Sequence, residues 1–266
     1  MRLTVNGIAL EVIDRGRKEG LALVLLHYFG GSSRAWSAVI AALQAEHRCI
    51  APDLRGFGRS GAPDTGYAVS DYADDVADLA GRLELERYAL VGHSMGGKIA
   101  LALAARQPAA LEALILVAPS PPTPEPIGEA ERIRLVASHG DRAAARESAG
   151  EITAIPLDDR TLDLVADDAV ASSRLAWRAW LECGSREDIS CRMSDVTIPV
   201  LVVAGTSDPH LPADLLEREV VRPIAGARMV LVPAAGHLLP IETPTAVANL
   251  IRDHLRLARL FQAARQ

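Results

Sequence analysis

Long apolar segments are absent from this chain of 266 residues. No uninterrupted apolar run approaches the roughly 18 residues that a membrane-spanning helix requires, so we expect no membrane association. The first six residues do not contain the basic stretch and apolar core of a secretion signal. We therefore expect a cytoplasmic protein.

Positive charge and cysteine are also scarce. The chain has 28 Lys plus Arg against 34 Asp plus Glu, a net charge of −6, and so lacks the basic footprint of a protein that binds nucleic acid. Its three cysteines, Cys49, Cys183 and Cys191, form no Cys-x-x-Cys pair and have no histidine near them at metal-ligand spacing. We expect no nucleic-acid partner, no disulfide framework and no metal site, and we interpret the cysteines as buried, reduced thiols.

The apolar residues that are present, 49% of the chain, can form a large core. Short runs rich in Val, Ile and Leu alternate with longer helical patterns, which is typical of an α/β fold with helices on both faces of a mostly parallel, doubly wound sheet. An Asn6-Gly7 turn predicts an opening hairpin. The predicted strands are residues 3–5, 8–13, 22–26, 48–51, 88–91, 113–117, 200–204 and 229–232, and the clearest predicted helices are 70–85, 95–106 and 243–259.

One region departs from this alternation. From residue 121 to about residue 197 the sequence has helical composition and no convincing buried strand. The proline-rich segment at its start, residues 120–126, disfavours helix and indicates a hinge or rigid strap. We predict a core domain of residues 1–120 and 198–266 with a helical cap, residues 121–197, inserted into it. Three basic residues of the cap, Arg132, Arg134 and Arg174, are interpreted as solvated helix faces.

The segment Gly92-His93-Ser94-Met95-Gly96 joins a predicted strand directly to a predicted helix. A nucleophile on a strained strand-to-helix turn needs small residues two positions to either side, because larger side chains would collide with the turning backbone. Gly92 and Gly96 meet that need, and the helix N-terminus favours an oxyanion beside Ser94. We predict Ser94 as a nucleophile on this turn, residues 92–96, which we call the elbow. The alternative is a glycine-rich turn with a solvent-exposed serine.

A serine nucleophile requires a base, and the chain has seven histidines. His237 follows the last predicted strand at its carboxyl end, where open α/β sheets bind ligands, and we predict it as the base. His210 either lines the pocket or faces solvent. His47 and His254 lie in or beside helical stretches and are interpreted as surface residues.

The base in turn needs an orienting carboxylate. Asp208 follows the buried strand predicted at 200–204, at the same edge of the sheet as His237, and is our candidate. The alternative for Asp208 is a turn residue that caps a loop. If Asp208 does not serve, Glu242 is another acid near the last strand.

These residues resemble the α/β-hydrolase family over nearly the whole chain, in the order nucleophile, acid, histidine, each after a strand. Residues 53–60, DLRGFGRS, resemble the family's Asp-x-Arg-Gly-x-Gly-x-Ser turn, where Asp53 and Arg55 are expected to be structural. The resemblance implies an α/β-hydrolase fold with an inserted cap. It also implies an oxyanion hole formed by the backbone N–H groups of Phe29 and Met95. Where many relatives have His-Gly the chain has His27-Tyr28, so Tyr28 either enters the pocket or packs.

These parts imply acyl transfer on a small-molecule substrate without a cofactor. A small to medium, apolar carboxylic ester is the expected substrate, and the protein is expected to be a monomer or homodimer. Carbon–carbon bond hydrolases, cofactor-free perhydrolases and hydroxynitrile lyases share the triad and stay open, as does a non-catalytic receptor. Haloalkane dehalogenases and epoxide hydrolases are less expected because they place Asp at the elbow.

Trp177 and Trp180 share one face of a cap helix, where they form either core or an aromatic wall of the pocket.

Overall fold

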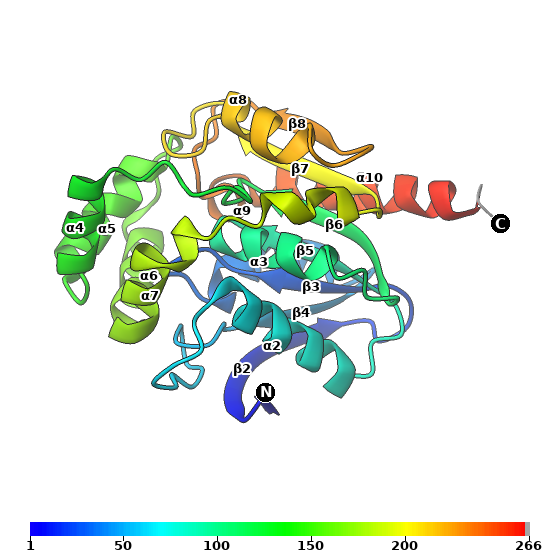
Figure 1. Ribbon diagram of the computed structural model, residues 1–266, viewed down its shortest axis with the longest axis horizontal. Coiled ribbons are helices and arrows are strands. Elements are labelled where there is room, and N and C mark those ends of the chain that lie inside the picture. The colour runs from blue at the N-terminus through cyan, green and yellow to red at the C-terminus, as the bar shows by residue number, and fades with distance from the viewer. Residues whose placement is uncertain (264–266) are drawn as a thin grey trace.

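An eight-stranded sheet runs through the computed structural model, which describes residues 1–263 (Figure 1). The strand order is β1-β2-β4-β3-β5-β6-β7-β8; β2 is antiparallel to β1 and β4, and the remaining neighbours are parallel. This arrangement confirms the predicted fold class, and all eight predicted strands are present. Their bounds are β1 Arg2–Val5, β2 Ile8–Gly16, β3 Ala22–Leu26, β4 Arg48–Pro52, β5 Tyr88–His93, β6 Leu111–Val117, β7 Val200–Gly205 and β8 Arg228–Val232.

The central strands are covered on both faces, which explains their continuous apolar sequence. Every residue of β3, β5 and β7 is buried. Alternate residues of these strands belong to two separate core clusters, because successive side chains of a strand point to opposite faces. One cluster contains α2, Val69–Arg82, and α3, Met95–Ala104; the other contains α1, Ser37–Leu43, and α10, Pro244–Ala263.

The helices that were predicted from periodicity are present with shifted ends. The predicted helix at 70–85 is α2 and ends at Arg82, and the one at 95–106 is α3 and ends at Ala104. The predicted helix at 243–259 is α10, which continues to Ala263. No helix among residues 1–263 is both long enough and apolar enough to cross a membrane.

Residues 121–197, which we call the cap segment, form only helices and turns among their regular elements. The four α-helices lie together at one end of the sheet (Figure 1). The division of the chain into a core domain and a cap domain stays a prediction. The elements of the segment are α4 Glu129–Ala137, α5 Arg142–Ile152, α6 Asp159–Ala171, α7 Arg174–Glu182, η2 Gly184–Arg186 and η3 Ser190–Asp195.

A buried lysine on α3 ties two stretches of the cap segment to the rest of the chain, one near its start and one after α7. Lys98 lies on α3, and its Nζ donates to the backbone carbonyls of Thr123, 3.1 Å away, and Glu187, 2.5 Å away. The proline-rich stretch that contains Thr123 is thus held as a strap across α3. Burial lowers the pKa of Lys98 to about 8.

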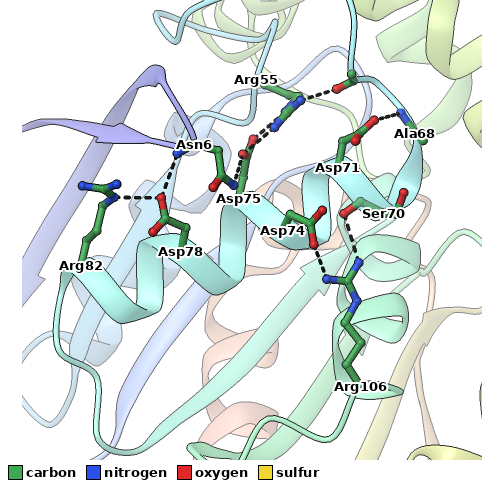
Figure 2. A network of polar contacts seen from close by, with 11 residues as sticks. Asn6, Arg55, Ala68, Ser70, Asp71, Asp74, Asp75, Asp78, Arg82 and Arg106 are labelled. Carbon is green, nitrogen blue, oxygen red and sulfur yellow. Dashed lines mark hydrogen bonds and ion pairs between the residues drawn. The ribbon is translucent and has the colours of Figure 1, made fainter.

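The DLRGFGRS segment is a structural turn, as expected. The carboxylate of Asp53 accepts from the backbone N–H groups of Ser33, at 2.7 Å, and Arg59, at 2.8 Å. The guanidinium of Arg55 forms a buried bidentate ion pair with Asp75 on α2, at 2.5 and 2.6 Å (Figure 2). These contacts fix the loop after β4 against the short helix η1, Ser33–Trp36, and against α2.

Two histidines that were predicted to be on the surface are buried. His47 is 7% exposed, and its Nδ1 lies 3.1 Å from the carbonyl oxygen of Leu21. His254 is 2% exposed, and its Nε2 lies 3.3 Å from the carbonyl oxygen of Pro199. The prediction was wrong because each ring packs on a segment next to a sheet strand: His47 on Leu21, just before β3, and His254 on Pro199, just before β7.

Arg132 and two cysteines also differ from expectation. Arg132 is buried rather than solvated: its guanidinium donates to the carbonyl of Leu181 and, at 2.6 Å, to Ser185 Oγ, because α4 packs against α7. Cys49 is buried as predicted, but Cys183, directly after α7, and Cys191, on the short helix η3, are exposed. Arg174 is exposed as predicted.

Candidate active site

The turn between β5 and α3 places Ser94 in a strained backbone conformation, with φ 51° and ψ −117°. Such a conformation costs on the order of 1–3 kcal/mol in a non-glycine residue and persists only where the surroundings enforce it. A Cβ at Gly92 would lie 2.7 Å from the Gly96 carbonyl carbon, and a Cβ at Gly96 would lie 2.6 Å from the Leu26 carbonyl oxygen. Both positions therefore require glycine, as the spacing predicted.

Three predicted residues from distant parts of the chain meet in a hydrogen-bonded series. Ser94 Oγ lies 2.9 Å from His237 Nε2, and His237 Nδ1 lies 2.7 Å from Asp208 Oδ2. Because a carboxylate only accepts, Nδ1 carries the proton and Nε2 is free to accept from the serine hydroxyl. The arrangement can deprotonate Ser94.

Electrostatics favour this protonation pattern. Burial works to raise the pKa of Asp208, but the charge of His237 and the hydrogen bonds that Asp208 accepts lower it overall. Two of these come from the backbone N–H groups of His210, at 2.9 Å, and Leu211, at 3.1 Å. Burial likewise works to lower the pKa of His237, and the adjacent Asp208 carboxylate outweighs it, so that this pKa is raised.

Two backbone N–H groups near Ser94 have no acceptor among residues 1–263: that of Met95, which follows Ser94 in the chain, and that of Phe29, which lines the same cavity. Met95 is the first residue of α3. Gly30 follows Phe29 with φ 76°, which turns the loop beside Ser94. These are the two groups that the family resemblance implied for an oxyanion hole, and that role stays a prediction.

A cavity of about 260 Å³ separates Ser94 from the cap segment. The residues predicted for the pocket all contribute to its lining, together with the candidate nucleophile and base: Tyr28, Phe29, Ser94, Trp177, Trp180, His210 and His237. Met95 is buried and is not part of the lining.

The aromatic residues combine packing with cavity lining. Trp177 is 8% exposed; its ring centroid lies 4.3 Å from that of Phe29, and its Nε1 donates to the Leu135 carbonyl at 2.8 Å. Trp180 is 2% exposed and also borders the cavity. Tyr28 packs its ring against His93, with centroids 5.2 Å apart. These aromatic residues therefore pack in the protein interior and also line the cavity, so the two predicted roles do not exclude each other.

His93, beside Ser94 in the sequence, points away from the cavity. Burial, aided by His237, lowers the pKa of His93 to about 3, so the ring is neutral near pH 7. Its Nε2 lies 2.9 Å from the backbone carbonyl oxygen of His237 and must donate, because a carbonyl only accepts. His93 thus connects the turn between β5 and α3 to the loop that carries His237.

Sequence reasoning missed the acidic residues of the cavity wall. Glu125 lies between two prolines in the strap and lines the cavity, and burial raises its pKa. Arg134 also lines the cavity, but its guanidinium is held by Glu131 in two hydrogen bonds of 2.7 and 2.8 Å. The one signal in the sequence was the acid within the proline-rich strap. The strap follows the carboxyl end of β6, at the edge of the sheet where the candidate site lies, so an acid there could have been expected near the site.

The fold and these residues define an α/β hydrolase. The model of the Alpha/beta hydrolase family matches residues 23–250, and the chain belongs to that family. It is 28% identical to a putative 2-succinyl-6-hydroxy-2,4-cyclohexadiene-1-carboxylate synthase of Bacillus subtilis, over 96% of this chain and 98% of the relative. It is 29% identical to a 2-(acetamidomethylene)succinate hydrolase of Mesorhizobium japonicum, over 94% of each.

Among solved structures, a thermophilic esterase from Thermogutta terrifontis is similar, with a TM-score of 0.81 and 28% identity over 97% of this chain and 98% of that one. The relatives support hydrolase activity, but their names differ in the compounds concerned. Fold alone therefore does not define the substrate.

Proposed function

We propose that this protein is a serine hydrolase that cleaves small to medium, uncharged, apolar carboxylic esters through an acyl-enzyme. The observation that carries the proposal is the series Ser94–His237–Asp208, with hydrogen bonds of 2.9 and 2.7 Å, beside two N–H groups without acceptors among the described residues. A serine, a correctly protonated imidazole and an orienting carboxylate are the parts that acyl transfer requires.

In the proposed reaction, Ser94 Oγ attacks the ester carbonyl carbon while its proton moves to His237 Nε2. The N–H groups of Met95 and Phe29 stabilise the oxyanion of the tetrahedral intermediate. His237 then protonates the departing alcohol and later takes a proton from the water that releases the acid. The Asp208 carboxylate stabilises the imidazolium that forms twice in this cycle.

The cavity supports an uncharged substrate. Its volume of about 260 Å³ lies slightly below the roughly 300–1,000 Å³ of most ligand pockets, and most of its lining is apolar. Arg134, the only lysine or arginine side chain in the described lining, is already bonded to Glu131, whereas Glu125 lines the wall near His237. The described lining has four acids, Glu125, Glu131, Asp141 and Glu151, against that one arginine, so a substrate carboxylate would find no free counter-ion. This differs from the carboxylate and succinate in the names of the two relatives.

A pair of ethyl esters matched in length tests the proposal. Ethyl butyrate and monoethyl succinate differ in whether the acyl chain ends in a methyl or a carboxylate, and hydrolysis of each can be followed by pH-stat titration. We expect kcat/KM for the butyrate to exceed that for the succinate by about tenfold or more, since unpaired like charges are strongly disfavoured. Equal values would contradict charge selection, whereas turnover of neither ester would contradict the ester hydrolase itself.

The same assays separate the other functions that share this triad. A perhydrolase would show acetic-acid-dependent peroxidation in excess of ester hydrolysis. A carbon–carbon bond hydrolase would react with a fluorophosphonate probe but leave simple esters intact. A non-catalytic receptor would show no turnover with any of these substrates.

A further inference from the structure

Glu242 lies at the end of α9, Leu239–Glu242, five residues after His237, and is only partly buried. Its carboxylate accepts four backbone hydrogen bonds. Oε2 accepts from Gly236 at 2.9 Å, Ala154 at 2.9 Å and Ile155 at 3.0 Å, while Oε1 accepts from Leu238 at 2.9 Å. Three of the four donors therefore share Oε2, and the fourth bonds Oε1. Both ring nitrogens of His237 are bonded to other residues, Nδ1 to Asp208 and Nε2 to Ser94, so Glu242 is not the partner of the His237 ring.

The four donors come from two segments more than 80 residues apart. Gly236 and Leu238 flank His237, whereas Ala154 and Ile155 belong to the cap segment just after α5. One carboxylate thus holds the loop of the candidate base and a stretch of the cap segment together. Hydrogen bonds to an ionised acceptor are among the stronger ones in proteins, because the charge attracts each N–H dipole.

Two further contacts join the same segments. The backbone N–H of His237 donates to the carbonyl of Ile152 at 2.8 Å. A Cβ at Gly236 would lie 2.5 Å from the nitrogen of Ala154, so the close approach depends on glycine at that position. With His93 donating to its carbonyl, the backbone of His237 is fixed from the cap segment on one side and from the elbow on the other.

This unit also forms part of the substrate cavity, since Ile152 and His237 both line it. We infer that Glu242 is a positioning residue that locks the His237 loop to residues 152–155, so that the orientation of the base and the position of a cavity wall are set together. The inference rests on the proposed function for its catalytic consequence. Its structural content, a single cooperative unit of two distant segments, does not depend on which substrate is used.

Glu242→Gln tests the inference with the full chain and ethyl butyrate. Glutamine keeps one acceptor oxygen but turns an NH₂ donor toward N–H donors, so the lock weakens without a change in size. We expect kcat to fall about tenfold to a hundredfold while a fluorophosphonate probe still labels Ser94, more slowly. We also expect a changed kcat/KM ratio between ethyl acetate and ethyl hexanoate, because the wall at Ile152 shifts with the loop.

The pH profile supplies a readout that a general loss of stability does not move. Burial lowers the pKa of His237, and the nearby Asp208 carboxylate raises it. The negative charge of Glu242 makes a smaller contribution that also raises this pKa. Its removal should shift the acidic limb of the kcat/KM profile to lower pH. Glu112→Gln, which removes a charge at the far end of β6, and Val76→Ala, which truncates a core residue of α2, are the controls and should leave the profile and the ester ratio unchanged.

Hydrogen–deuterium exchange tests the lock without any assay of activity. In the parent protein the amides of Ala154, Ile155, Gly236, His237 and Leu238 should exchange as one group, and Glu242→Gln should accelerate exchange in both segments together. Independent exchange of the two segments in the parent, or acceleration of only one in the variant, would overturn the inference. So would a folded variant with the parent's kcat, pH profile and ester ratio. Joint exchange in a parent that hydrolyses no ester would instead refute the proposed function alone.

Discussion

At the scale of single residues, the proposed chemistry depends on atoms that the backbone holds in place. Ser94 is strained, His237 is bonded through its ring and through both backbone groups, and Asp208 accepts from two N–H groups as well as from the imidazole. Preorganisation of this kind avoids reorganisation during the reaction, which is where much of the catalytic effect of such sites arises.

Ser94→Ala should abolish covalent labelling by a fluorophosphonate probe and lower ester turnover by a factor on the order of 10⁴ to 10⁶. The hydroxyl is the group that forms the acyl-enzyme in the proposed reaction. The matched control is Ser120→Ala, which removes another buried hydroxyl after the neighbouring strand β6 and should preserve labelling. Labelling of Ser94→Ala at the parent's rate would remove Ser94 from the mechanism.

Asp208→Asn and Asp53→Asn should separate a catalytic from a structural acid. An asparagine at position 208 would present either its amide NH₂ or a neutral oxygen to Nδ1, and we expect turnover to fall by about 10⁴ with little loss of folding. An asparagine at position 53 would weaken the hydrogen bonds from Ser33 and Arg59, and we expect about 1–3 kcal/mol of lost stability with turnover largely retained. Thermal unfolding and kcat, measured on both variants, separate the two roles. Near-parent turnover in a folded Asp208→Asn protein would contradict the assignment of Asp208 as the acid that orients His237.

At the scale of elements, the cap segment is anchored to the sheet at several points. Lys98 holds the segment near its start and again after α7, and Glu242 holds the chain after α5. Asp168 on α6 is buried and accepts from Ser32 Oγ at 2.8 Å and from the guanidinium of Arg34. These anchors all contact segments that border Ser94. Small displacements of the segment are therefore expected to reach the candidate active site.

Trp177→Ala and Trp180→Ala should affect stability and substrate preference together, since each side chain is buried and also lines the cavity. We expect a loss of about 3–5 kcal/mol for each, with a shift of kcat/KM toward ethyl hexanoate relative to ethyl acetate as the cavity enlarges. Tyr72→Ala, which truncates a buried aromatic residue of α2 outside the cavity lining, should lower the melting temperature alone. An unchanged ester ratio in both tryptophan variants would exclude them from specificity.

At the scale of the whole molecule, the buried histidines predict acid sensitivity. Burial lowers the pKa of His93 to about 3 and that of His254 to about 4, from about 6.5 in the unfolded chain. The unfolded state then binds protons first, so stability falls as the pH decreases below about 6.5, by about 1.4 kcal/mol per pH unit for each group. His237 has the opposite sign, because its pKa is raised in the folded state.

The melting temperature should therefore decrease as the pH is lowered from 7 to 4.5. The melting temperature of His254→Gln should decrease less steeply than that of the parent. Glutamine can still donate to the Pro199 carbonyl and accept from Arg228, which are the neighbours of the His254 ring, but it cannot be protonated. His139→Gln, at a partly exposed histidine of the cap segment, is the control and should follow the parent. Identical slopes for parent and His254→Gln would contradict this account of acid unfolding.

The positions of the strands and the identity of the candidate nucleophile were determined by the sequence alone. Strands covered on both faces must be apolar throughout, so the central strands could be located, and the Asn6-Gly7 turn marked the opening hairpin. The tight turn at Ser94 admits only glycine at two fixed positions. These are local requirements, and local requirements leave patterns in the sequence. The ends of helices were less certain because the last turn depends on the residues that pack against it.

Only the tertiary structure decided which polar residues are buried and which of them meet. His254 and Arg132 lie in helical sequence that is compatible with solvent, and their burial follows from the elements that cover them. The two roles of Trp177 arise because its ring packs on Phe29 and at the same time lines the cavity. The four bonds of Glu242 join residues 154–155 to residues 236–238, and no local pattern predicts such a contact, because the partners are brought together by the packing of the cap segment on the sheet.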